Sequence, residues 1–113
     1  MKREDAMETI LENDNSALWL VMDFSLHSAD DFWSDENIKR LADAFLYYST
    51  AYDYDNISIF VLHAAVLYCH LLDREKFNSV MKLSFKYNCD LSVPERAFLM
   101  TLYGTLNRSI AIK

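Results

Sequence analysis

The sequence predicts an all-α fold of five to six short antiparallel helices in one domain over residues 1–113. The first observation is that the 113 residues include one Gly and one Pro, where average usage gives roughly eight Gly and six Pro. Without Asn-Gly turns, a β-sandwich or barrel is disfavoured. The second observation is the helical spacing of the apolar residues, and the third is an Asn, Asp or Ser before most apolar segments.

Three helices are predicted in the N-terminal half. The first covers residues 3–12, and the polar segment 13–16 separates it from a second helix over 16–28. The apolar residues of the second helix predict an inward stripe of Leu18, Val21, Met22 and Leu26, with Trp19 beside it. Ser34 is the expected N-cap of a third helix that reaches Tyr52, because a Ser side chain can accept from the first free backbone N–H groups.

The C-terminal half predicts three more helices. Residues 57–72 are apolar on all sides, which is typical of a helix buried by several neighbours. Asp73 caps a helix over 74–87, whose inward residues are expected to be Phe77, Val80, Met81, Ser84 and Phe85. Ser92 and Glu95 match a capping box at the start of the last helix, with Pro94 in its first turn. Gly104 lies inside that helix, where it suits a close helix crossing or an early fraying of the helix end.

The formal charge is unevenly distributed. Residues 1–56 carry 13 acids and 4 bases, and residues 57–113 carry 4 acids and 7 bases, in a chain of net charge −6. The acidic half disfavours nucleic acid and anionic membranes as partners. It suits a basic protein partner or the basic half of the same chain, and it is also typical of an ordinary solvated helix surface.

No catalytic or metal-binding pattern is found in the sequence. His63 and His70 are seven residues apart, about 10 Å along a helix axis, which is too far for one metal ion. Cys69 and His70 are adjacent on a helix and do not face each other. With two cysteines, Cys69 and Cys89, a disulfide framework is not expected. We therefore expect no enzyme activity, no cofactor, no metal and no membrane insertion.

The segment HAAVLYCHLLDREKFNSVMKLSFKYN at residues 63–88 resembles a tetratricopeptide-type helical hairpin. A helix with Ala and Tyr ends at Leu-Leu-Asp, turns through Arg-Glu-Lys and re-enters with an aromatic residue, Phe77. The helix that begins at Pro94 would open a further repeat, so the resemblance covers about residues 57–108 and implies a helical-hairpin array; a compact bundle is the other arrangement open to these helices.

Small tetratricopeptide-like proteins of this length are similar to the needle-subunit chaperones of bacterial type III secretion. The resemblance implies a cytoplasmic chaperone or adaptor that holds an aggregation-prone helical subunit in an apolar groove, often with a second small co-chaperone. It also implies that the groove is formed by first-helix residues of the hairpins: Leu62, Val66, Phe98, Leu102 and Leu106.

A second hypothesis comes from the acidic half of the chain. Aromatic residues ringed by carboxylates would suit the cationic active site of a toxin or enzyme, as in an acidic immunity or inhibitor protein. The residues expected to form this acidic-aromatic patch are Asp30, Asp31, Trp33, Tyr52, Asp53, Tyr54 and Asp55. Binding by such a patch is expected to slow as salt rises, whereas an apolar groove is nearly insensitive to salt.

Overall fold

The computed structural model describes residues 2–51, 57–86 and 91–112, and across these residues the chain forms six helices and no strand. The helices are α1 (Arg3–Glu8), α2 (Asp14–His27), α3 (Asp35–Ala51), α4 (Ile57–His70), α5 (Arg74–Lys86) and α6 (Val93–Ile112). The predicted all-α fold class is therefore confirmed. The first helix is shorter than predicted, because it ends at Glu8 and the chain continues through turns.

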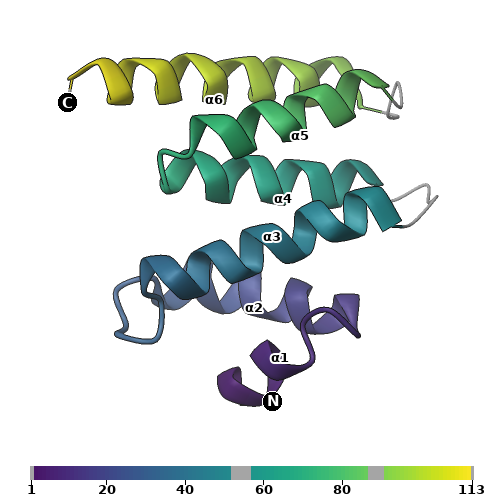
Figure 1. Ribbon diagram of the computed structural model, residues 1–113, viewed down its shortest axis with the longest axis vertical. Helices are drawn as coiled ribbons and strands as arrows, with labels where there is room; N and C mark the ends of the chain where they lie inside the picture. The colour runs from purple at the N-terminus through teal and green to yellow at the C-terminus, as the bar shows by residue number, and fades with distance from the viewer. Residues whose placement is uncertain (1, 52–56, 87–90, 113) are drawn as a thin grey trace.

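The helices form an antiparallel array that follows the chain order. Figure 1 shows α1 at one end, α6 at the other, and α2 behind α3 in this view. The central helix α4 contacts α3, α5 and α6. The molecule measures 37 × 35 × 21 Å, and its shortest dimension is about two helix diameters. Most helices in the array therefore have one face toward a neighbour and another toward solvent.

Side-chain caps begin four of the helices, as the sequence predicts. Asn13 Oδ1 accepts from Asn15 N at 2.9 Å before α2, and Ser34 Oγ accepts from Asn37 N at 3.3 Å before α3. Asp73 Oδ1 accepts from Lys76 N at 3.0 Å at the start of α5. At α6, Ser92 Oγ accepts from Glu95 N at 3.3 Å while Glu95 Oε1 accepts from Ser92 N at 2.9 Å, which is the predicted capping box.

The connection from α4 to α5 turns without glycine. Leu72 has a φ of 57°, in the left-handed region where glycine is usual. The backbone N–H of Asp73 donates to the carbonyl of Tyr68 at 3.0 Å, and that of Leu72 donates to Cys69 at 3.1 Å. These two bonds satisfy two of the last four carbonyls of α4 and hold the tight turn that sets α5 antiparallel to α4.

The core is centred on α3 and α4. Its largest fully buried side chains include Phe45 and Tyr48 from α3, Tyr68 from α4 and Phe77 from α5. Both buried tyrosine hydroxyls are satisfied: Tyr48 donates to the carbonyl of Ile10, and Tyr68 donates to the carboxylate of Asp43. As predicted, α4 packs against several neighbours: it contacts α3, α5 and α6 and places Phe60, Val61, Ala64, Ala65, Leu67 and Tyr68 in the core. It is not buried all round, because Ile59 and Val66 are exposed.

The inward faces of α2 and α5 differ from the prediction. On α2 the buried residues are Ser16, Ala17 and Leu20, whereas Met22 and Leu26 are exposed. Because α2 is apolar around most of its circumference, several stripes have helical spacing, and packing against α3 selects one of them. On α5 the small Ser84 occupies the inward position, and its neighbour Phe85 is exposed, as are Leu11 on the α1–α2 connection and Ile59 on α4.

Candidate functional site

The five residues of the predicted groove do not line one open surface. Leu106 is fully buried in the core, so its assignment to a groove is wrong. The other four are more exposed, but they belong to different surroundings: Leu62 and Leu102 are half-buried and pack against the core, Val66 lines a hollow shared with α2, and Phe98 is exposed on α6. The reason is that α6 packs on α4 with Leu99 and Leu106 turned inward, which leaves Phe98 outside.

Trp33, an aromatic residue of the predicted acidic-aromatic patch, is buried and does not contribute to the surface. Trp33 is 5% exposed, and its ring packs edge-on against Phe24 and Phe32 at centroid distances of 5.3 and 4.9 Å. Its Nε1 donates to Asp23 Oδ2 at 2.7 Å. The prediction of an exposed Trp33 is therefore wrong, because the ring fills the junction between α2 and α3. Asp30 and Asp31 are exposed as predicted, and Tyr52, Asp53, Tyr54 and Asp55 lie outside the described residues.

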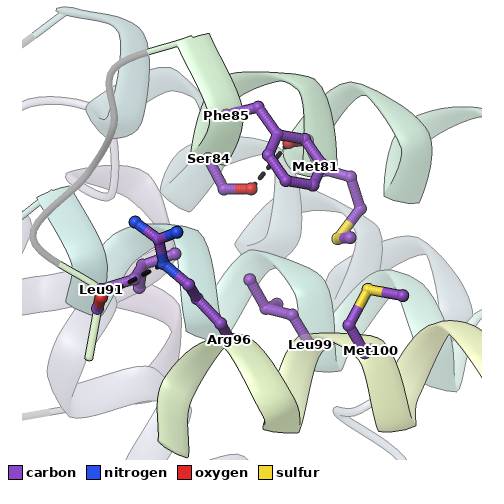
Figure 2. A pocket seen from close by; sticks show the side chains of 7 residues that line it. All are labelled: Met81, Ser84, Phe85, Leu91, Arg96, Leu99 and Met100. Atoms are coloured by element: carbon purple, nitrogen blue, oxygen red, sulfur yellow. Dashed lines mark hydrogen bonds between the residues drawn. The ribbon is translucent and has the colours of Figure 1, made fainter. Parts of the chain in front are cut away.

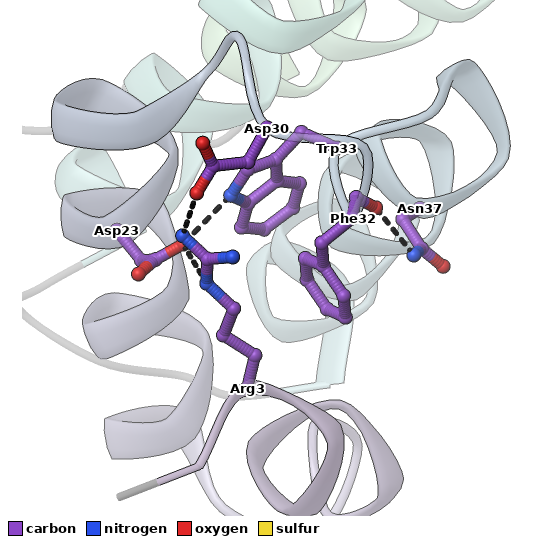
Figure 3. A network of polar contacts seen from close by, with 6 residues as sticks. All are labelled: Arg3, Asp23, Asp30, Phe32, Trp33 and Asn37. Carbon is purple, nitrogen blue, oxygen red and sulfur yellow. Dashed lines mark hydrogen bonds and ion pairs between the residues drawn. The ribbon is translucent and has the colours of Figure 1, made fainter.

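Asp30 takes part in a polar cluster that anchors α1. The Arg3 guanidinium contacts Asp23 Oδ2 at 2.8 Å and Asp30 Oδ2 at 2.6 Å, and its Cζ lies 5.6 Å from the Phe32 ring centroid. Figure 3 shows Arg3 reaching from α1 to both carboxylates beside the Trp33 ring. Donating hydrogen bonds to the carboxylates of Asp30 and Asp23 raises the pKa of Arg3 above its ordinary value. This cluster joins α1, α2 and the connector after α2, so we assign it a structural role.

An open apolar site lies between α5 and α6. Figure 2 shows its inner end, a small cavity of about 60 Å³ lined by Met81, Ser84, Phe85, Leu91, Arg96, Leu99 and Met100. Beside it is a wider hollow of about 350 Å³ lined by Asn78, Met81, Lys82, Phe85, Met100 and Tyr103. Since Met81, Phe85 and Met100 line both spaces, we treat these ten residues as one site, called the α5–α6 groove.

Local structure explains why the groove is open. Phe77, Val80 and Ser84 face the core from α5. Met81 and Phe85 therefore lie at the edge of the buried face, where they line the groove. The α6 wall is set by the capping box, which starts the helix, and by Leu91, which is buried just before it. Along this wall Met100 is 55% exposed, and Phe85 opposite is 71% exposed.

Two polar contacts hold the inner end of the groove. Arg96 Nε donates to the carbonyl of Leu91 at 3.3 Å, and both residues line the small cavity (Figure 2). Ser84 Oγ donates to the carbonyl of Met81 at 2.7 Å, so the hydroxyl is satisfied within α5. At the outer end the Tyr103 ring stacks on the buried Phe77 ring, with centroids 6.2 Å apart. The two hydrogen bonds each lie within one wall, the Tyr103–Phe77 contact joins α5 to α6, and Phe85 and Met100 are exposed.

The sequence indicates this site through a surplus of apolar residues on α5 and α6, but helical periodicity alone does not tell which of them face outward. From Phe77 to Phe85, apolar residues cover a broader arc of α5 than one neighbouring helix can bury. The excess, Met81 and Phe85, lines the groove in the structure. On α6 the signal is Met100 and Tyr103, which lie three residues apart beside the inward residues.

Comparison with known proteins identifies no relative. No family model matches the chain, and no curated protein or solved structure is significantly similar to it. The site is therefore interpreted from its own geometry.

The titratable groups near the core do not form a metal site. Among the described residues, no three His, Cys, Asp or Glu side chains are placed to hold a metal ion. His63 packs against Phe45 at a centroid distance of 5.1 Å, and burial lowers its pKa. Burial also raises the pKa of the Cys69 thiol, whose Sγ lies 3.8 Å from the carbonyl oxygen of Leu102. Within the described ranges, no helix is long and apolar enough to cross a bilayer.

A second hollow, of about 440 Å³, lies between α2 and α4. Its lining is Leu18, Val21, Met22, Phe24, Ser25, His63, Val66 and Leu67. The Ser25 hydroxyl donates to the carbonyl of Val21 in its own helix, at 2.9 Å. This lining includes no Lys, Arg, Asp or Glu that would orient a partner, whereas the α5–α6 groove combines its apolar floor with Lys82 and Arg96. We therefore take the α5–α6 groove as the candidate functional site.

Proposed function

We propose that this chain is a small, non-enzymatic protein-binding module that holds the apolar face of a partner helix in the α5–α6 groove. The observation that carries the proposal is the exposure of Phe85, which is 71% exposed beside Met81 and Met100. Large exposed apolar side chains gathered in a hollow are typical of interaction sites, whereas scattered ones are not. An aromatic residue in such a place is a common energetic centre of binding.

The groove suits a helix for two physical reasons. Burying a Phe or Met side chain contributes about 1.5–3 kcal/mol, so a few such contacts support a stable complex. A helix presents its anchors at positions i, i+3, i+4 and i+7, which form a straight apolar stripe that fits a groove between two antiparallel helices. Unbranched Met81 and Met100 can adjust to side chains of different shape.

This mode of action supports a chaperone or adaptor function in the cytoplasm, as the tetratricopeptide-type resemblance implies. The partner would be a helical protein with an aggregation-prone apolar face, such as a subunit awaiting secretion. A second small co-chaperone could bind the same subunit. The proposed groove differs from the one expected from the resemblance, since it uses Met81, Phe85 and Met100 of α5 and α6. The alternative of an acidic inhibitor has less support, because Trp33 of its acidic-aromatic patch is buried.

The test uses a synthetic amphipathic peptide of about 18 residues with Leu and Phe on one face and neutral Gln on the flanks. Binding is followed by NMR of the protein with ¹³C-labelled methionine methyl groups. We expect the signals of Met81 and Met100 to shift. Buried Met7 and exposed Met22, which lie on other parts of the array, serve as internal controls and are expected to stay unchanged.

Two substitutions at equally exposed residues sharpen the test. Phe85→Ser is expected to weaken peptide binding about tenfold, the loss of about 1.4 kcal/mol. Leu26→Ser on α2 removes an apolar side chain that is also 71% exposed, and it is expected to leave the affinity unchanged. Both variants are expected to melt like the parent chain in circular dichroism. The proposal is wrong if Phe85→Ser binds as well as the parent, or if Met22 shifts in place of the groove methionines.

A further inference from the structure

The α5–α6 groove is basic within an acidic protein. The chain has a net charge of −6, yet the sequences of α5 and α6 contain six basic and two acidic residues. None of the ten residues that line the groove is acidic, and two of them, Lys82 and Arg96, are basic. Two of these six bases thus lie beside the exposed apolar side chains, with no acidic residue in the lining.

The two basic residues stand on different walls. Lys82 is exposed on α5, beside Phe85 and Met81. Arg96 belongs to the first turns of α6, donates to the Leu91 carbonyl and lines the inner cavity. A helix lying in the groove would therefore have a basic side chain beside each edge of its apolar stripe.

Neither acidic residue of α5 and α6 is among the residues that line the groove. Glu95 accepts from the backbone N–H and the hydroxyl of Ser92, both at 2.9 Å, and these hydrogen bonds lower its pKa. The Glu95 carboxylate is thus engaged in the hydrogen bonds of the capping box. Glu75 lies one turn before Asn78 on α5, outside the lining residues, and Arg74 precedes it directly.

We infer that the partner helix carries Asp or Glu along both edges of its apolar stripe. This inference rests on the proposed function of the groove and names the chemistry of its partner. Carboxylates beside Lys82 and Arg96 form ion pairs at the rim, where they set orientation and speed the encounter. A basic helix would meet like charges at the rim, so the same two residues exclude it.

The experiment compares three peptides with one apolar face and with Glu, Gln or Lys on the flanks. Fluorescence anisotropy of each labelled peptide gives its Kd at about 50 and about 500 mM NaCl, which span weak and strong screening. At low salt we expect the Glu peptide to bind about fivefold tighter than the Gln peptide, the effect of two exposed ion pairs. The Lys peptide is expected to bind more weakly than the Gln peptide. At high salt the three affinities are expected to converge.

Variants assign the preference to the two residues. Lys82→Glu is expected to reduce the advantage of the Glu peptide, and the double variant Lys82→Glu/Arg96→Gln is expected to remove it. Arg108→Glu is the matched control, because Arg108 is an exposed base on α6 that does not line the groove. It is expected to preserve the order of the peptides. Circular dichroism checks that each variant is folded, and Arg96→Ala in the double variant is the second test if Arg96→Gln does not fold.

The outcomes separate the inference from the proposed function. If no peptide binds, the proposed function fails. If the Gln peptide binds and the Glu peptide gains nothing at low salt, the groove still holds a helix but the inference is overturned. The inference is also overturned if Arg108→Glu changes the preference as strongly as Lys82→Glu. An anionic membrane surface is the other ligand that Lys82 and Arg96 could attract, and sedimentation with vesicles of equal parts phosphatidylcholine and phosphatidylglycerol tests it. Vesicle binding that depends on Lys82, without peptide binding, would also overturn the inference of an acidic partner helix.

Discussion

The indole of Trp33 shows how one buried nitrogen stabilises a connector. Its ring packs against Phe24 and Phe32, and its Nε1 donates to Asp23 at 2.7 Å. A hydrogen bond to a charged group contributes more than one between neutral groups, because the charge strengthens the electrostatic attraction. Asp23 also pairs with Arg3, so the indole and the guanidinium share one carboxylate.

Trp33→Phe is expected to lower the free energy of unfolding by about 1.5–3 kcal/mol, because it removes this hydrogen bond and leaves Asp23 with one partner fewer. Urea denaturation measures the change. Trp19→Phe, at a half-buried position on α2, is the control and is expected to stay within about 1 kcal/mol of the parent. An unchanged midpoint for Trp33→Phe would contradict a stabilising role for the indole.

His63 gives the stability a pH dependence of known sign. Burial lowers its pKa, so the folded protein binds the proton less readily than the unfolded chain, whose His has an ordinary pKa near 6.5. Stability is therefore complete above about pH 6.5 and is lost as the pH falls through that value toward the lower folded pKa.

We expect the melting temperature of the parent to fall between about pH 7.5 and pH 5.5, the range in which an unfolded His gains its proton. His63→Gln is expected to flatten this fall, whatever its effect at neutral pH. His27→Gln changes an exposed His on α2 and is expected to keep the parent's slope. Equal slopes for the parent and His63→Gln would refute the assignment.

At the scale of single helices, α6 contains the chain's one glycine. A Cβ built on Gly104 would lie 3.5 Å from Arg108 Nη1 of the same helix. Within the described residues, no atom of another helix lies within 4 Å of that Cβ. The expectation that Gly104 permits a close helix crossing is therefore wrong. Since its φ is not positive, the position accepts an L-residue without backbone strain.

Gly104→Ala is expected to raise the free energy of unfolding by about 0.5–1 kcal/mol, because Ala loses less backbone entropy on forming a helix. Thermal melts and urea titrations measure the gain. Ala65→Gly makes the reverse exchange inside the fully buried part of α4, and it is expected to destabilise the protein. A loss of stability in Gly104→Ala would show that the site needs space that the structure does not reveal.

Helix positions were predictable, but the faces of the helices were only partly so. Caps act within one turn, so Ser34, Asp73 and Ser92 could be identified from sequence alone. The inward face depends on which neighbour packs there, and an apolar helix such as α2 offers several choices. The same limit applies to the site: the groove depends on Phe85 being outward and Ser84 inward, which only the packing of α5 decides.

At the scale of the whole molecule, α1 is the terminal helix of the array and has little packing of its own. It contributes Ala6 and Met7 to the core, and the Arg3 cluster fastens it to α2 and to the connector after α2. A short helix with few buried residues opens locally more readily than the central helices.

Arg3→Leu is expected to speed amide hydrogen exchange in α1 while exchange in α3 and α4 stays near the parent rate. Exchange followed by mass spectrometry or NMR measures both regions in one sample. Arg40→Leu, at an exposed position on α3, is the control for loss of one positive charge. Equal acceleration in all helices would mean that α1 does not open separately.

The stacked rings of Tyr103 and Phe77 join the rim of the groove to the buried core. A partner seated on Tyr103 thus restrains a ring that packs directly on the hydrophobic interior. Binding is then expected to raise the melting temperature of the whole chain, since a ligand at about 100 times its Kd raises the free energy of unfolding by about 2.7 kcal/mol. A label-free thermal-shift screen of candidate helices would therefore rank them by affinity.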